Sequence, residues 1–155
     1  MQLKIKRLTE TAILPVKAHQ SDAGLDICAD EDVTINVGET VTVSTGLSIA
    51  IPEGYYGRLK GRSGLTSKTV IRVQEGTIDA NYRGEIKVIC ELRDLTARKE
   101  PGRLTVIMRS GGYSIKKGER IAQLIIQPLP TVEVVEVDEL DDTDRGDGGF
   151  GSTGV

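Results

Sequence analysis

The segment TINVGETVTVSTGLSIAIP, residues 34–52, alternates apolar and polar side chains along most of its length. A period of two is typical of a strand that buries one face. A break at Thr45-Gly46 divides the segment, which therefore predicts a hairpin or a bent pair of strands. The apolar positions are Val41 and Val43 before the break and Leu47, Ile49 and Ile51 after it.

Similar strand patterns recur along the chain, and turn glycines and prolines separate them at short intervals. No window of a dozen residues has clear helical periodicity, and only one or two turns around Ser63–Lys68 are predicted to be helical. The core must be built from Val, Ile and Leu, because the chain has one Phe, four Tyr and no Trp. This composition and pattern predict an all-β sandwich or barrel. The other strand candidates are EIKVICEL (residues 85–92), RIAQLIIQP (120–128) and VEVVEV (132–137).

The length of 155 residues predicts a single folded domain, which we expect to span residues 1–137. From Glu133 to Asp147 the chain is strongly acidic and should repel itself into an extended form. We therefore expect residues 138–155 to form an acidic arm that carries a glycine-rich lid.

Charge and hydropathy argue against several classes of partner and location. The net charge of −3 gives no basic field, so neither nucleic acid nor an anionic membrane is expected as a main partner. No stretch approaches the length of a membrane span, and the start MQLKIKRLTE lacks the apolar core of a signal peptide, so a cytoplasmic location is expected. Cys28 and Cys90 have no metal-binding spacing and are predicted to be buried free thiols.

Residues that could perform chemistry occur in five clusters. Each of the first four has an ordinary explanation when taken alone, such as a turn aspartate or a polar strand residue. The start of the predicted helix could hold a phosphate through Arg62, Ser63 and backbone N–H groups. The clusters are SDAGLDICA with Asp22 and Asp26, GRSGLTSK, GTIDANYRGE with Asp79 and Tyr82 in a predicted hairpin turn, GERIAQLIIQP with Arg120 and Gln123, and RGDGGFGSTG.

The fifth cluster, residues 145–154, has five glycines and should not hold a helix or strand. Its glycines with Ser152 and Thr153 suit phosphate oxygens, as in other backbone anion sites. It lacks the G-K-[ST] ending of a P-loop, and its RGD triplet has no secretory context to support an adhesion role. A ligand is therefore needed to order it.

Taken together and in this order, the five clusters resemble the motifs of the trimeric all-β dUTPase family, across Ser21 to Gly154. The resemblance implies a distorted jelly-roll-like β-barrel with a flexible C-terminal arm. It also implies hydrolysis of dUTP to dUMP and pyrophosphate by attack of water on the α-phosphorus, assisted by Mg²⁺. Such an enzyme limits uracil incorporation into DNA and supplies dUMP for thymidylate synthesis. A homotrimer whose sites are shared between chains is implied as well.

The resemblance also implies roles for individual residues. Asp79 would orient and deprotonate the water, and Asp26 would hold Mg²⁺ through a water molecule. Tyr82 would pack against the deoxyribose and exclude a 2′-hydroxyl, and Phe150 would stack on the uracil. The other implied substrate contacts are Arg62, Ser63, Gly64 and Gln123 at the α- and β-phosphates, Arg145, Gly151, Ser152 and Thr153 around the γ-phosphate, and main-chain groups from Val73 to Tyr82, including Gly76 and Ile78, at the uracil edge.

Two features depart from the family pattern. Val73 stands where the family often has an Asn that reaches the uracil, so base recognition would rest on the backbone. Residues 93–113 are longer than the short turn expected between the third and fourth motifs, and they include a strand-like RLTVIM. This insert is interpreted as a protruding hairpin without a specific role or, as an alternative hypothesis, as a docking surface for a partner protein.

Two other functions remain open from the sequence. A relative of dCTP deaminase would need a catalytic Glu ten residues after Asp79, where this chain has Ile89, and would lack the glycine-rich tail. A regulator that senses dUTP and binds a partner protein is excluded by no residue and is compatible with hydrolysis.

Overall fold

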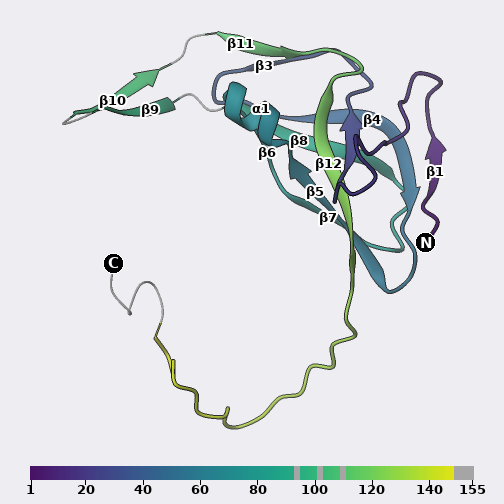
Figure 1. Cartoon of the computed structure of the whole chain (residues 1–155), viewed down its shortest axis with the longest axis vertical. Helices are drawn as coiled ribbons and strands as arrows, with labels where there is room; N and C mark the ends of the chain where they lie inside the picture. The colour runs from purple at the N-terminus through teal and green to yellow at the C-terminus, as the bar shows by residue number, and fades with distance from the viewer. Residues whose placement is uncertain (93–94, 101–102, 109–110, 149–155) are drawn as a thin grey trace.

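The computed structural model describes residues 1–92, 95–100, 103–108 and 111–148, with the backbone alone for 95–100 and 103–108. The described part is built almost entirely of strands (Figure 1), as predicted. The elements are β1 (Lys4–Arg7), β2 (Leu25–Cys28), β3 (Val33–Asn36), β4 (Thr40–Ala50), β5 (Tyr55–Gly61), α1 (Ser63–Lys68), β6 (Ile71–Val73), β7 (Gly76–Ile78), β8 (Glu85–Leu92), β9 (Leu95–Glu100), β10 (Arg103–Met108), β11 (Gly112–Ile115) and β12 (Arg120–Pro128).

Two antiparallel four-stranded sheets form the body. The first has the strand order β1-β4-β8-β6, and the second has the order β2-β12-β5-β7. Two smaller antiparallel pairs, β3 with β11 and β9 with β10, complete the described strands. The chain crosses repeatedly between the sheets, as expected for a barrel or sandwich rather than a series of hairpins.

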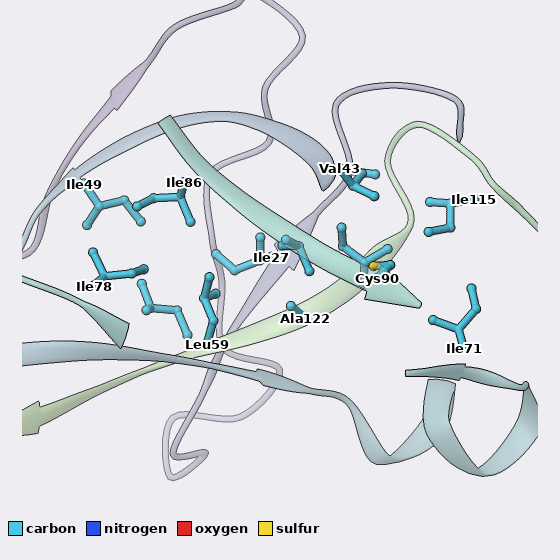
Figure 2. Close-up of a cluster of buried hydrophobic side chains, with 14 of the residues drawn as sticks. Ile27, Val43, Ile49, Leu59, Ile71, Ile78, Ile86, Cys90, Ile115 and Ala122 are labelled. Carbon is cyan, nitrogen blue, oxygen red and sulfur yellow. The ribbon is translucent and has the colours of Figure 1, made fainter. Parts of the chain in front are cut away.

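The core lies between the two sheets and consists of aliphatic side chains (Figure 2). Strand β8 shows why the pattern predicted this: Ile86, Val88, Cys90 and Leu92 are all buried, while the residues between them are more exposed. Ile27, Leu59 and Ala122 meet this face from the second sheet, and the predicted alternation is confirmed.

Cys28 and Cys90 are both free and buried, as predicted. Burial raises the pKa of the Cys90 thiol to about 11. Burial, partly opposed by Arg120, also raises the pKa of Cys28.

In the segment that predicted the fold, residues 34–36 belong to β3, and the residues on both sides of the Thr45-Gly46 break form one bent strand, β4, rather than a hairpin. Its register against β8 shifts between Ser44 and Ser48, where Gly46 has a φ of +66°. A side chain at position 46 would also lie 2.8 Å from the Cβ atom of Ala12. The glycine therefore allows one strand to bend and bury residues on both sides of the predicted break.

Four other predictions meet different outcomes. The short helix α1 is confirmed with the bounds Ser63–Lys68, and within the insert β9 and β10 pair antiparallel, as expected for a hairpin. The hairpin between Val73 and Ile86 is wrong, because β6 pairs with β8 while β7 pairs with β5 in the other sheet. The strand predicted at residues 132–137 is also wrong: its valines are exposed and no described strand pairs with it. None of the described helices is long and apolar enough to cross a membrane.

A buried carboxylate fixes the N-terminal segment to the body. The Asp30 side chain is only 6% exposed, accepts a hydrogen bond from the Thr9 hydroxyl and forms an ion pair with Lys117 at 3.2 Å. The hydrogen bond from Thr9, with a smaller contribution from Lys117, holds the pKa of Asp30 below its ordinary value despite burial. Its stabilising effect is therefore complete above the unfolded-state pKa, about 3.9, and is lost as the pH falls through the lower folded-state pKa.

The Asp30→Asn variant should accordingly be less stable at pH 7 by about 1–3 kcal/mol. A neutral amide cannot form the ion pair with Lys117, and one of its polar groups would be buried without a hydrogen-bond partner. The difference should shrink as the pH falls below about 4. Urea unfolding at pH 7 and at lower pH would measure both effects. Asp32→Asn is the matched control: this neighbouring carboxylate contacts Lys116 and the Lys117 N–H but is 62% exposed, so its loss should destabilise the chain much less than the loss of Asp30. Equal losses in the two variants would contradict the role given to burial.

Candidate functional site

A first cleft of about 290 Å³ lies where β2, β12 and the end of β5 meet. Asp26 on β2 and Gln123 on β12 are register partners, and Gln123 also pairs with Lys60 on β5. Sheet pairing thus brings together three clusters that are far apart in the sequence. The cleft is lined by Ala18, Asp22, Ala23, Gly24, Asp26, Arg62, Ser63, Gly64 and Gln123.

Asp26 is the centre of an ion-pair network in this cleft. Its carboxylate accepts from Nε of Arg62 at 2.8 Å and from Nη1 of Arg120 at 3.0 Å, and its side chain is only 14% exposed. Arg62 also donates to the Arg120 carbonyl at 3.2 Å. Two cations share one anion, which leaves the cluster with a net positive charge. Such a cluster can attract an anionic ligand.

Arg120 was named from the sequence in the GERIAQLIIQP cluster but was assigned no role in the site. Arg120 and Gln123 are polar residues in an otherwise apolar strand, and this pattern could have pointed to Arg120 as a site residue. The sequence does not reveal the register shift between Arg120 and Ala122, which places Arg120 beside β2.

Gln123 is held by its backbone surroundings. Its Nε2 donates to the Gly61 carbonyl at 3.2 Å, and a Cβ atom at Gly24 would lie 2.6 Å from its Oε1. Ser63 and Gly64 begin α1, and the first N–H groups of a helix have no partner within it. These donors surround the same space as the arginines. Asp22 has the ordinary role of a turn residue, because its carboxylate accepts from the His19 N–H at 2.8 Å.

A second cleft of about 500 Å³ lies at the end of β7. It contains the predicted Gly76, Ile78, Asp79 and Tyr82, together with Thr42, Leu59, Thr77, Glu85, Ile86, Lys87 and Ile89. Asp79 and Tyr82 close a turn through the hydrogen bond from the Tyr82 N–H to the Asp79 carbonyl at 3.1 Å. The Tyr82 hydroxyl donates to the Glu85 carbonyl, also at 3.1 Å, which fixes the ring. Both side chains are exposed and available to a ligand.

Val73 lines neither cleft. It pairs with Cys90 at the end of β6, and its Cβ lies 3.5 Å from the position that a Cβ on Gly61 would take. Its side chain thus packs against the core beside Gly61, while the chain after it leads to Gly76 in the second cleft.

The two clefts share no lining residue, and strand β5 separates them. Gly57 on β5 pairs with Ile78, immediately before Asp79, whereas Arg62 follows the opposite end of β5. Five residues of strand correspond to about 17 Å. Within one chain, Asp79 is therefore too far from the Arg62 cluster for both to contact one phosphorus atom.

The described part of the tail ends in an exposed turn. Nε of Arg145 donates to the Gly148 carbonyl at 2.8 Å, and Gly146 has a φ of +52°. Phe150, Gly151, Ser152 and Thr153 lie outside the described residues.

A model of the dUTPase family matches residues 10–92 and 96–154 of the chain. The chain belongs to the dUTPase family.

Individual dUTPases are similar to this chain in sequence over nearly its whole length. The chain is 46% identical, over 153 residues, to the deoxyuridine 5′-triphosphate nucleotidohydrolase of Paramecium bursaria Chlorella virus 1, with 99% of this chain and 98% of the viral one covered. It is 48% identical to the Hydrogenobaculum enzyme over 158 residues, covering 100% and 99% of the two chains. The chain is thus an enzyme, a nucleotidohydrolase of nucleotide metabolism.

Solved dUTPase structures confirm the all-β jelly-roll-like fold. A Staphylococcus bacteriophage 80alpha dUTPase with dUpNHpp superposes with a TM-score of 0.86 at 36% identity, covering 99% of each chain. A dUTPase of phage phi11 of S. aureus, described with a structural Mg(II) ion, gives a TM-score of 0.77 at 33% identity, covering 90% of this chain and 98% of the phage one. Another phi11 dUTPase structure, described as showing a species-specific insert, gives 0.79 at 32% identity, covering 92% and 100%.

The first dUTPase cleft fits an Mg²⁺ ion carried by the substrate rather than by the protein. Both Asp26 oxygens already accept from arginines, which leaves their remaining lone pairs for water. Among the described residues there is no group of three or more His, Cys, Asp or Glu side chains that could hold a metal. Mg²⁺ often keeps several waters and binds through phosphates with few protein ligands, which is compatible with a water-mediated contact to Asp26.

Proposed function

We propose that the chain hydrolyses dUTP to dUMP and pyrophosphate in a site formed by the first cleft of one chain and the second cleft of another. The observation that carries this proposal is that the two parts of the chemistry lie apart: phosphate donors gather around Asp26 in the first cleft, and the exposed carboxylate of Asp79 lies in the second cleft. Each cleft alone lacks a part that the reaction requires.

The proposed step is an in-line displacement. Asp79 orients a water molecule and accepts its proton as the water oxygen bonds to the α-phosphorus, and the bond to the bridging oxygen breaks to release pyrophosphate. Arg62, Ser63, Gly64 and Gln123 hold the α- and β-phosphates and stabilise the charge that moves toward the leaving group. Mg²⁺, when bound on the triphosphate, would neutralise part of that charge, and Asp26 would contact it through water.

The second cleft would hold the nucleoside. The Tyr82 ring, fixed by its hydrogen bond to Glu85, would pack on the deoxyribose and leave no space for a 2′-hydroxyl. Main-chain groups around Gly76 and Ile78 would read the uracil edge, and the backbone of Val73 would take the place of the side-chain contact that Asn makes in other members. From the tail, Phe150 would stack on the base, and Arg145, Gly151, Ser152 and Thr153 would close over the γ-phosphate.

A closed homotrimer is the assembly proposed for this shared site. A ring of identical contacts gives each first cleft one second cleft from a neighbour, which a folded single chain cannot provide. Sedimentation should therefore give the mass of a trimer at micromolar concentration, and a monomer that retained full activity would refute the shared site.

Release of pyrophosphate from dUTP, dCTP and UTP tests the function directly. We expect rapid release from dUTP only. Binding of dUTP without turnover would favour a sensor instead, and ammonia release from dCTP would favour a deaminase. The structure gives the deaminase little support, because Ile89, which lines the second cleft, cannot move a proton.

A second function, control of a partner protein through the insert, is favoured by the hairpin β9–β10. This pair belongs to neither main sheet, and it projects from the body (Figure 1). Phage 80alpha dUTPases of similar fold are described as controlling the transfer of virulence genes. Deleting residues 93–110 should leave pyrophosphate release within about twofold of the full chain, because the described lining residues of both clefts lie outside the segment. It should abolish any complex with a partner protein, and a complex unaffected by the deletion would refute the docking role.

A further inference from the structure

Strand β7, whose main chain is proposed to read the uracil, is a short strand at the edge of a sheet. It has three residues, Gly76–Ile78, and it lies at the end of the second sheet, where it pairs only with β5. Its other edge is therefore free to offer main-chain N–H and C=O groups to a ligand. So short an edge strand has few ladder hydrogen bonds, and it separates from its neighbour more easily than a central strand does.

The position of this free edge is important because Val73 gives the base no help. Val73 packs against the core and lines neither cleft, so its side chain cannot hold a base in the second cleft. Base recognition then depends on main-chain groups, which are placed only by the strand that carries them. A displacement of that strand by about 1 Å is enough to break a hydrogen bond to the base.

A cluster of three charged side chains holds the residue that precedes β7. Oε2 of Glu75 accepts from Nε of Arg58 at 3.1 Å and from Nη2 of the same side chain, and Oε1 of Glu75 lies 3.2 Å from Nζ of Lys60. The hydrogen bond from Arg58, and then the one from Lys60, hold the pKa of Glu75 below its ordinary value, so the carboxylate is charged at neutral pH. We call these three residues the Glu75 clamp.

The register of the sheet explains why the clamp residues meet. Leu59 pairs with Gly76, the first residue of β7. Continuing this antiparallel ladder by one residue places Lys60 opposite Glu75, with Arg58 diagonal to it. Leu59 is buried, so Arg58 and Lys60 both point to the outer face of β5. The clamp therefore extends the attachment of β7 to β5 beyond the three ladder pairs.

The clamp contributes little to the stability of the whole fold. The side chains of Arg58, Lys60 and Glu75 are 41%, 37% and 48% exposed, and water weakens ion pairs of this kind. Movement of β7 alone is a different matter, because it breaks only three ladder pairs and the clamp and leaves the core folded. The clamp can thus control how often β7 is in place without changing global unfolding.

We propose that the Glu75 clamp determines base specificity by holding the free edge of β7 in the position that reads uracil. Glu75 lines neither cleft, so it is a positioning residue that acts through β7. The inference rests on the proposed function, in which β7 reads the base. A clamp that places β7 before the nucleotide arrives keeps the binding-competent fraction of the chains high, and the apparent affinity rises with that fraction.

Glu75→Gln should raise the KM for dUTP by about threefold to tenfold and change kcat by less than about twofold. A neutral amide cannot pair with two cations, so β7 is in place less often, but a bound base holds the edge again at saturation. The preference for dUTP over dTTP, as a ratio of kcat/KM values, should fall by a similar factor, because a looser edge makes room for the thymine methyl group. Pyrophosphate release measures these quantities, and thermal unfolding should change little.

Three further variants show whether the ion pairs are the cause. Arg58→Gln should act like Glu75→Gln, and the double variant should be little worse than Glu75→Gln alone, because both single changes remove the same pair. The exchange Arg58→Glu/Glu75→Arg should restore most of the KM and of the preference for dUTP. The matched control is Asp32→Asn, which breaks an exposed ion pair with Lys116 outside both clefts and should leave both values unchanged.

Several results would overturn the proposal. These are an unchanged KM and base preference in Glu75→Gln, fully additive losses in the double variant, or an equal loss in Asp32→Asn. A fall in kcat and in thermal stability with no change in base preference would show a purely structural role. An unaltered chain that hydrolyses dUTP selectively, with silent clamp variants, refutes the clamp alone. An unaltered chain that does not hydrolyse dUTP refutes the proposed function, and the clamp proposal with it.

Discussion

The Asp79→Asn variant should bind dUTP but release pyrophosphate about 10²–10⁴-fold more slowly than the unaltered chain. An amide has the shape of the carboxylate but cannot accept the proton of the attacking water. The fold should not change, because the Asp79 side chain is exposed and the turn is held by its backbone carbonyl. Single-turnover release of pyrophosphate and the affinity for a non-hydrolysable dUTP analogue would separate the lost proton transfer from lost binding.

A second inactive chain makes this prediction sharper. Arg62→Ala removes a phosphate donor at the far end of β5 and leaves Asp26 paired with Arg120 alone. Mixing Asp79→Asn chains with Arg62→Ala chains should restore about a quarter of the activity, because each shared site then receives both intact parts with that frequency in random assembly. Recovery near zero in verified mixed trimers would show that Asp79 and Arg62 act within one chain, contrary to the proposed site.

Truncation after Asp144 should lower kcat/KM for dUTP by about 10²–10⁴-fold while leaving a folded trimer. Base–aromatic stacking contributes about 1–3 kcal/mol, and the loss of a charged donor on a phosphate costs about 1.5–3 kcal/mol more. The deleted segment begins at Arg145, whose described contact is local, to Gly148, so thermal stability without ligand should be unchanged.

Phe150→Ala separates the two contributions to this loss. It should retain the phosphate contacts of the tail and lose only the stacking on uracil, for a smaller decrease of about 5–150-fold. Full activity in the truncated chain would show that the tail is no lid, even if the reaction proposed is correct.

The fold was largely predictable because burial on one face of a sheet imposes a period of two. Strand β8 shows this, with its four alternate residues buried as the sequence predicted. The failures arise where a strand needs a partner that local pattern does not reveal. The VEVVEV segment has the right pattern but no neighbour within the chain, and the residues after Val73 join the other sheet instead of forming a hairpin.

Three lining residues of the first cleft were named from the sequence, but their arrangement was not. The resemblance to dUTPases identified Asp26, Arg62 and Gln123, and sheet pairing places all three in one cleft. The contact of Arg120 with Asp26 depends on a register shift in β12 that the sequence pattern does not predict. Similarly, only the three-dimensional structure shows that Asp79 lies at the other end of β5.

That separation along β5 makes the proposed reaction a property of the assembly. A newly folded chain carries both clefts but cannot bring Asp79 and the Arg62 cluster to one phosphorus atom. On this proposal a monomer is therefore inactive until it assembles with other subunits. Specific activity should then depend on protein concentration near the dissociation constant of the trimer. Any molecule that splits the subunits would inhibit the enzyme without entering either cleft, and mutations at the contacts between subunits could abolish catalysis while every catalytic residue remains intact.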